Sequence, residues 1–257
     1  MNKAAITVEP ICAFNDNYIW LIGASNGLAY IVDPGDAQPV LDTLAARKLT
    51  LGGILLTHWH PDHTGGVKEL KRLTGCVVWG PYNDAIEGID HRVTEGDVVS
   101  LPGLTLDIFT VPGHTLDHIA YCGDGLLFCG DTLFVGGCGR VFEGTFPMMR
   151  ASLEKLRSLP PETRVFCAHE YTEANLRFAK AADPDNPALH AHAETCQGLR
   201  RDGHPTVPST LGIEAATNPF LRWDNNALAQ GLFAAGRCQS TTPDEVFRGL
   251  RTWKDTF

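Results

Sequence analysis

Short apolar runs alternate with helix-like segments along the first 170 residues of this 257-residue chain. Their spacing and boundaries predict strands over 5–12, 18–22, 28–32, 53–57, 77–79, 104–110, 119–122, 126–129 and 164–167. Helical spacing predicts helices over 37–48, 67–73 and 149–159. Because strands that alternate with helices pack as sheets covered by helices, the sequence predicts an α/β fold for residues 1–170.

The strand signals stop after residue 169. Helices are expected over 172–182, 187–201, 225–235 and 243–253, separated by loops such as DPDNP and HPTVPST. No Gly/Ser-rich linker separates the two parts, so the second should pack directly against the first. We therefore predict two domains, 1–170 and a smaller helical domain over 171–257.

Composition excludes several classes of partner. The net charge of -9 gives no electrostatic reason to bind nucleic acid or an anionic membrane surface. No apolar run approaches the ~20 residues of a membrane-spanning helix, and the N-terminus lacks a signal-peptide pattern. The eight cysteines form no C-x-x-C pair and are typical of buried thiols in a reducing compartment. We expect a cytoplasmic protein, and a monomer because no large apolar stripe compels a dimer.

The segment THWHPDHTGG follows the predicted buried strand 53–57 and holds four potential metal ligands within six positions. His58 and His60 are two residues apart, so in an extended segment they face the same side and can share one ion. Asp62 and His63 follow Pro61 and can turn toward a second ion. The spacing indicates two adjacent metal sites.

Two pairs of ligands do not complete two coordination shells, so further ligands must come from other strand ends. His114 in VPGHT, Asp131 in FCGDT and His169 in FCAHE each follow a strand-like run. Imidazole and carboxylate ligands suit Zn, Fe(II) and Mn alike. His118, four residues after His114, is expected to pack in the structure, although a role behind the ligands is open.

The motifs THWHPDH, GHT, GDT and AHE, in this order, resemble the metallo-β-lactamase superfamily. The resemblance implies an αββα sandwich over the first two thirds of the chain, followed here by the smaller C-terminal α-helical domain. It also implies two divalent metal ions per chain, with Zn expected and Fe or Mn as alternatives. It assigns one ion to His58, His60 and His114, a second to Asp62, His63 and His169, and a bridging role to Asp131.

Two cations bridged by a carboxylate can hold a shared water as hydroxide at neutral pH, which indicates hydrolysis. The Gly-x-Ser-x-Gly elbow of serine hydrolases is absent. GDTLFVGGCGRVFEGT, AHEYT, NPFLR and LRTWKDTF resemble the hydroxyacylglutathione hydrolases, the glyoxalase II family. This resemblance implies hydrolysis of S-(2-hydroxyacyl)glutathione thioesters, typically S-D-lactoylglutathione, to glutathione and D-lactate, the second step of methylglyoxal detoxification. The helical domain would then bind glutathione.

The same resemblance suggests substrate contacts. Arg140, Arg251 and Lys254 would offer donors to the glycine carboxylate of glutathione, and Tyr171 a hydroxyl. Replacement of Arg251 should then mainly raise the Michaelis constant. Phe142 stands where members of the family can carry Tyr, so one hydrogen bond worth about 0.5–1.5 kcal/mol is lost.

The motifs leave three alternatives open. A glutathione persulfide dioxygenase shares the fold but uses one iron and O₂, and a lactonase or β-lactamase would prefer a cyclic substrate. A zinc-stabilised binding module is disfavoured because structural zinc sites usually have closed shells with Cys ligands.

Overall fold

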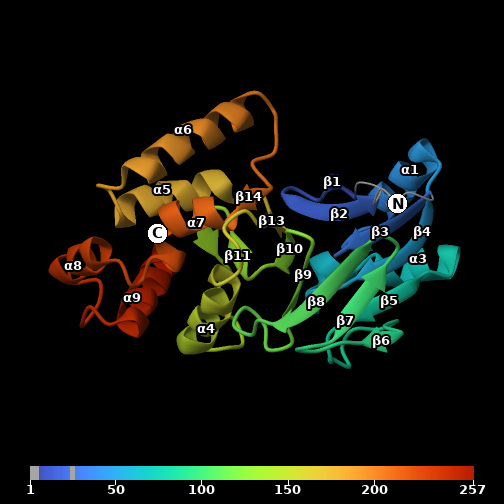
Figure 1. Cartoon of the computed structure of the whole chain (residues 1–257), viewed down its shortest axis with the longest axis horizontal. Coiled ribbons are helices and arrows are strands. Elements are labelled where there is room, and N and C mark those ends of the chain that lie inside the picture. Colours follow the sequence, from blue (N-terminus) through green and yellow to red (C-terminus); the bar gives the residue numbers. More distant parts are fainter. Residues whose placement is uncertain (1–5, 24–26) are drawn as a thin grey trace. The chain divides into compact units, whose positions relative to one another are not determined.

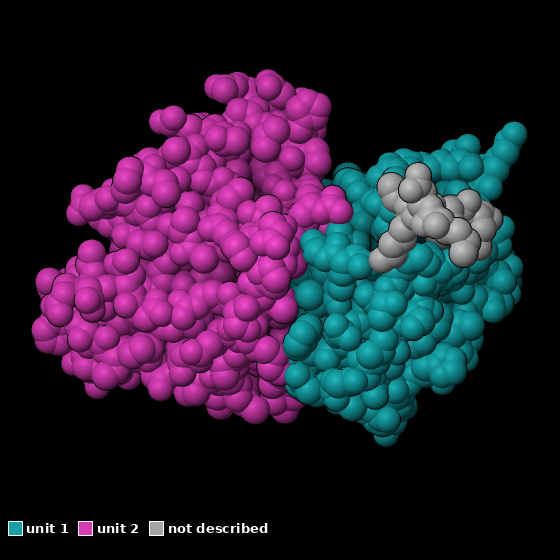
Figure 2. Space-filling model, in the orientation of Figure 1, with its two compact units in different colours: residues 1–110, 117–130 teal, residues 111–116, 131–257 magenta. Residues whose placement is uncertain are grey.

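The computed structural model describes residues 6–23 and 27–257. The chain folds into two compact units, which Figure 2 shows in different colours. The first unit comprises residues 1–110 and 117–130, and the second comprises 111–116 and 131–257. These boundaries differ from those of the predicted domains 1–170 and 171–257, which stay a prediction.

The first unit contains a mixed six-stranded sheet in the order β1-β2-β3-β4-β5-β6 (Figure 1). Its strands are β1 Thr7–Ala13, β2 Asn17–Gly23, β3 Leu28–Val32, β4 Thr50–Leu55, β5 Val77–Gly80 and β6 His91–Arg92. The first three strands pair antiparallel and the last four pair parallel. The helices α1 Ala37–Arg47 and α3 Val67–Thr74 connect the parallel strands. Parallel strands end at the same edge of a sheet, so the segments that follow β3 and β4 meet there.

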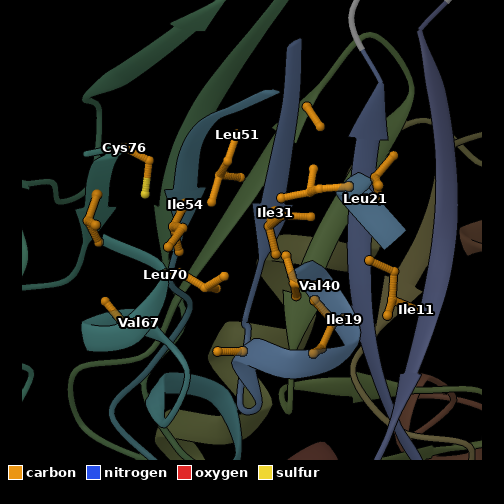
Figure 3. Packing of buried hydrophobic residues seen from close by; sticks show 14 of the residues in the cluster. Ile11, Ile19, Leu21, Ile31, Val40, Leu51, Ile54, Val67, Leu70 and Cys76 are labelled. Carbon is orange, nitrogen blue, oxygen red and sulfur yellow. The ribbon is translucent and has the colours of Figure 1, made fainter. Parts of the chain in front are cut away.

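A core of aliphatic side chains joins this sheet to its helices. Ile19, Ile31 and Ile54 come from three neighbouring strands and are fully buried. Figure 3 shows them facing Val40 of α1 and Leu70 of α3, which belong to the same buried cluster. Burial of each such side chain contributes about 1.5–3 kcal/mol. The cluster therefore fixes the sheet edge from which residues 57–66, the histidine-rich segment, emerge.

A second group of strands in this unit forms an antiparallel meander. It comprises β7 Val98–Leu101, β8 Leu104–Thr110, β9 Ile119–Gly123 and β10 Leu126–Gly130. The buried Tyr121 hydroxyl in β9 donates a hydrogen bond of 2.9 Å to the carbonyl of Leu56, just past β4. Two β layers of one unit are thereby linked close to the histidine-rich segment.

The second unit is mainly helical. It contains the hairpin β11 Leu133–Phe134 and β12 Gly137–Cys138, and the antiparallel pair β13 Arg164–Cys167 and β14 Ser209–Thr210. Its helices are α4 Phe146–Arg157, α5 Thr172–Ala182, α6 Pro187–Arg201, α7 Leu211–Thr217, the 3₁₀ helix Pro219–Leu221, α8 Asn226–Ala234 and α9 Pro243–Thr256. Within the described ranges, no helix has the length and apolar character needed to cross a membrane.

Most predicted elements are confirmed, and the differences are mainly short elements. The expectation of no strands after residue 169 is wrong, because Ser209 and Thr210 pair with Val165 and Arg164. A two-residue strand carries no periodicity that a sequence can reveal. The strands β6, β11 and β12 and the four-residue helix α2 Pro61–Thr64 are also too short to show a periodicity, and they were not predicted. The longer elements β7 and α7 are absent from the predicted elements as well. Ala5, at the start of the first predicted strand, lies outside the described residues.

The cysteines fit the expectation of buried thiols, with one exception. All eight are free, and Cys12 is the exposed one, whereas Cys122 is half-buried and the others are buried. Burial raises the pKa of Cys122 to about 11 and that of Cys167 to about 12.

Because the thiolate is the reactive form, a thiol reagent at about pH 8 should label Cys12 rapidly and the other cysteines only after denaturation. Titration with Ellman's reagent checks this, with Cys12→Ser as the control. Two or more fast thiols in the native protein would contradict it.

Candidate metal centre

The first unit gathers the histidine-rich segment and Asp33 at one sheet edge. β3 and β4 run parallel, with Val32 opposite Leu55 in the register. Asp33 follows β3, and its backbone N–H donates to the Leu55 carbonyl at 3.0 Å. The turn after β3 passes very close to the histidine-rich segment. A Cβ on Gly35 would lie 1.9 Å from the carbonyl oxygen of Asp62, so only glycine fits at this position.

His58 and His60 present two nitrogen atoms to one point. His58 Nε2 lies 3.1 Å from His60 Nδ1. Two nitrogens bound to one tetrahedral Zn at roughly 2.0–2.1 Å would lie roughly 3.4 Å apart. The pair therefore fits the ligands of a single ion, as the spacing in the sequence predicts.

Asp62 and His63 form a second pair beside the first. The short helix α2 places His63 Nε2 3.4 Å from Asp62 Oδ2. The His63 ring centroid lies 4.1 Å from that of His58. Asn17 Nδ2 donates to Asp62 Oδ2 at 3.0 Å and orients the carboxylate. One unit by itself thus presents donors for two neighbouring ions.

Asp33 and Thr57 fix the rings of two of these histidines. The Thr57 hydroxyl donates to Asp33 Oδ2 at 2.6 Å, so its oxygen accepts from His58 Nδ1 at 3.0 Å. His63 Nδ1 lies 3.1 Å from the same carboxylate oxygen. Both rings carry their proton on Nδ1 in this arrangement, which leaves Nε2 as the ligand atom. The sequence does not reveal this role of Asp33, because its D-P-G context predicts only a turn.

His118 packs on the His58 ring. The two rings are stacked with centroids 4.5 Å apart and an interplanar angle of 14°. His118 is fully buried, and its Nδ1 donates to the Ile119 carbonyl at 3.0 Å. These contacts restrain the orientation of His58 from the ring face.

The second unit brings together His114, Asp131 and His169. Asp131 Oδ2 lies 3.4 Å from His114 Nε2, and Asp131 Oδ1 lies 3.4 Å from His169 Nε2. All three side chains are buried. Each oxygen of one carboxylate therefore faces a different imidazole, which is the donor pattern that a carboxylate bridging two ions requires.

The hairpin segment that follows Asp131 orients His114. The ring donates from Nδ1 to the carbonyl oxygen of Arg140 at 2.7 Å, so Nε2 is the ligand atom. A Cβ on Gly139 would lie 1.9 Å from the Asp131 carbonyl oxygen, so only glycine allows this close return of the chain. His169 is held differently, since its ring stacks on that of Tyr171 with centroids 4.7 Å apart and an interplanar angle of 4°.

The predicted substrate contacts differ in their exposure. Arg140 is mostly exposed, with its guanidinium carbon 5.6 Å above the ring of Phe142. Phe142 is 60% exposed and its ring lies edge-on to His114, with centroids 5.3 Å apart. Tyr171 is also exposed.

The two predicted contacts from α9 lie in different surroundings. Lys254 Nζ lies 5.6 Å above the ring of Phe178, and burial lowers its pKa, with further lowering by Arg251 and Arg177. Arg251, by contrast, is 4% exposed.

Comparisons with known proteins agree along the whole chain. The family model of the metallo-beta-lactamase superfamily matches residues 14–169, and that of the hydroxyacylglutathione hydrolase C-terminus matches residues 170–257. A hydroxyacylglutathione hydrolase of Chromohalobacter salexigens is 51% identical over 98% of this chain and its own full length. One of Photobacterium profundum is 50% identical, again over 98% of this chain and all of the relative.

The chain belongs to the hydroxyacylglutathione hydrolase family of the metallo-β-lactamase superfamily. Solved structures show the same fold. ETHE1 from Myxococcus xanthus is 24% identical with a TM-score of 0.66 over 98% of this chain and 99% of its own. TTHA1623, crystallised in a di-iron-bound form, is 26% identical with a TM-score of 0.61 over 83% of this chain and 100% of its own. The predicted α/β sandwich with a C-terminal helical region is confirmed.

Proposed function

We propose that this member of the hydroxyacylglutathione hydrolase family is a metal-dependent hydrolase of S-(2-hydroxyacyl)glutathione thioesters, typically S-D-lactoylglutathione. Its products would be glutathione and the hydroxy acid, D-lactate for that substrate. The observation that carries the proposal is Asp131, whose two oxygens each face one histidine in a protein about half identical to hydroxyacylglutathione hydrolases over its full length.

We assign the metal ligands from the types of their donor atoms and the distances between them. The donors are imidazole nitrogens and carboxylate oxygens, with no thiolate among them, which fits Zn, Fe(II) or Mn. His58 and His60 would hold one ion together with His114, and Asp131 would bridge to the second. The second ion would also take Asp62, His63 and His169.

When bound, two such ions acidify a water molecule and polarise the carbonyl of the thioester. The chain's own residues supply orientation. Asp33, Thr57 and the Arg140 carbonyl hold three imidazoles by their Nδ1 atoms, so that the Nε2 atoms face the reaction site. In the net reaction a water oxygen replaces sulfur at the carbonyl carbon. Glutathione leaves as a thiolate, which needs little proton assistance because a thiol has a pKa near 8.5.

Exposed side chains near the second-unit ligands would contact glutathione. Arg140 is the proposed partner of a carboxylate, Tyr171 offers a hydroxyl, and Phe142 offers an apolar face beside His114. Among the described residues the Lys254 ammonium group has no hydrogen-bonded or ion-paired partner, which suits a cation that receives a substrate carboxylate. Arg251 is proposed to share this role; without substrate its guanidinium donates to the Cys138 carbonyl and to Asp255.

Two further features belong to the proposal. Eight free thiols fit a reducing compartment, so we place the enzyme in the cytoplasm, and we propose that it acts as a monomer. The persulfide dioxygenase and lactonase alternatives are not favoured, because the relatives that match the whole chain are named hydroxyacylglutathione hydrolases.

Removal of metal tests the proposal directly. Chelator-treated protein should lose hydrolysis of S-D-lactoylglutathione, and addition of Zn, Mn or Fe(II) should restore it. The measurement is the initial rate of thioester loss, with metal per chain determined on the same samples. If metal binds but the thioester survives, the proposal fails, and lactones or glutathione persulfide with O₂ become the substrates to test.

A further inference from the structure

An exposed phenylalanine lies in the turn of the hairpin that joins β1 and β2. Ala13 pairs with Asn17 across this turn, which comprises residues 14–16. The side chain of Phe14 is 60% exposed, although phenylalanine is among the residue types most often buried. Most of the ring therefore adds no packing to the core of the first unit.

The backbone of Phe14 is strained. Its φ is 51°, in the left-handed region that glycine, asparagine and aspartate enter more readily than a bulky aromatic residue. Asn15 and Asp16, which tolerate this conformation better, follow directly in the chain. Because an exposed ring adds little packing, stability alone does not explain an aromatic residue at this position. A strained residue of this kind points to a function.

The same turn is tied to a proposed metal ligand. The Asn17 side chain donates from Nδ2 to Asp62 Oδ2 at 3.0 Å and to the Asp62 carbonyl at 3.3 Å. The position that a Cβ on Gly35 would take lies 1.9 Å from the Asp62 carbonyl oxygen and 2.9 Å from Phe14 Cε2. The missing side chain of Gly35 thus allows one edge of the Phe14 ring to pack beside the Asp62 backbone. The exposed part of the ring lies next to the residue proposed to bind the second ion.

The acyl end of the substrate has no contact assigned to it so far. The proposed contacts to glutathione all belong to the second unit and comprise Arg140, Phe142, Tyr171, Arg251 and Lys254. The 2-hydroxyacyl group has one apolar part, the substituent on carbon 2. A phenyl ring beside Asp62 suits this substituent, because removal of apolar surface from water is favourable and needs no hydrogen bond.

We propose that Phe14 is a specificity-determining residue, whose exposed ring packs against the substituent on carbon 2 of the 2-hydroxyacyl group. The enzyme would then favour substrates in which this substituent is large and apolar. The inference rests on the proposed function, since it concerns the acyl group of the same thioester. Phe14 is not a metal ligand, so its contribution should depend on the substrate and leave the metal content unchanged.

Three thioesters of glutathione test this dependence. The glycoloyl thioester carries hydrogen on carbon 2, the D-lactoyl thioester a methyl group and the D-mandeloyl thioester a phenyl group. The measurement is kcat/KM for each thioester with the native protein, Phe14→Ala and Phe14→Leu. Phe14→Ala should lower kcat/KM about tenfold for the mandeloyl thioester and less than about twofold for the glycoloyl thioester, since a lost apolar contact to a half-exposed ring lies at the low end of such effects. Phe14→Leu should recover part of the loss.

Two further variants separate specificity from stability. Phe233→Ala removes an exposed ring from α8, an element that carries none of the proposed ligands or substrate contacts, and should leave all three kcat/KM values unchanged. Phe14→Gly removes the ring together with the backbone strain, so it should keep the native melting temperature and show the same loss as Phe14→Ala. Metal per chain, determined for every variant, should equal that of the native protein.

The outcomes distinguish this inference from the proposed function. Equal losses for all three thioesters, an unchanged kcat/KM for the mandeloyl thioester, or loss of metal from the Phe14 variants would overturn the inference and leave the proposed function standing. A metal-loaded native protein that hydrolyses none of the three thioesters would overturn the proposed function and this inference with it.

Discussion

Asp131→Ala should lose metal and thioester hydrolysis together. Its two carboxylate oxygens face His114 and His169 at 3.4 Å each, so one substitution removes a ligand from both proposed ions. Loss of a hydrogen-bond partner behind a ligand costs about 10- to 100-fold, so loss of a shared ligand should lower kcat on the order of 10³-fold or more. Metal per chain by mass spectrometry and initial rates of hydrolysis measure the two effects on the same preparation.

Asp185→Ala is the matched control for this experiment. Asp185 belongs to the same unit and is exposed in the loop between α5 and α6. It should keep full metal content and activity. A metal-replete, fully active Asp131→Ala protein would refute the bridging role and with it the proposed mechanism.

Asp33→Ala should weaken metal binding although Asp33 is not among the proposed ligands. Its carboxylate accepts from the Thr57 N–H at 2.8 Å and from the Thr57 hydroxyl, and it holds His63 Nδ1. Without it, His63 loses the partner that fixes its tautomer, and His58 loses its support through Thr57. We expect about 10- to 100-fold weaker metal affinity, measured by chelator competition, with activity restored by excess metal.

Asp36→Ala separates this effect from a loss of stability. Asp36 lies three residues away and caps α1 through a 3.0 Å hydrogen bond from the Gln38 N–H. Loss of such a cap costs about 1 kcal/mol of stability and touches no ligand. Asp36→Ala should therefore lower the melting temperature with unchanged metal affinity. Equal metal affinity in Asp33→Ala and the native protein would show that the two histidines orient themselves without the carboxylate.

Local sequence predicted the regular elements well where they are long. The helices expected over 172–182 and 187–201 coincide with α5 and α6, and the strand over 104–110 coincides with β8. Such elements bury one face along their whole length, so the apolar residues recur at regular spacing in the local sequence. The two-residue strands form only because a distant strand pairs with them, and they are too short to show a regular spacing of apolar residues.

The histidine-rich segment shows what the spacing within a single motif can predict. Its spacing alone indicated that His58 and His60 pair on one side and that Asp62 and His63 form a second pair. Both pairs are present, with donor atoms 3.1 Å and 3.4 Å apart. The signal is local because all four residues lie within six positions of one chain segment.

The sequence by itself determined the order of elements, the donor types and the pairing of ligands within one segment. Only the tertiary structure decided the surroundings of residues far apart in the chain. It placed Asp33 behind two histidines that follow another strand, and it buried Arg251 against carbonyls more than a hundred positions away. The physical reason is that an ionised side chain takes its role from its partners. Burial and hydrogen bonding set those partners, and neither is encoded in neighbouring residues.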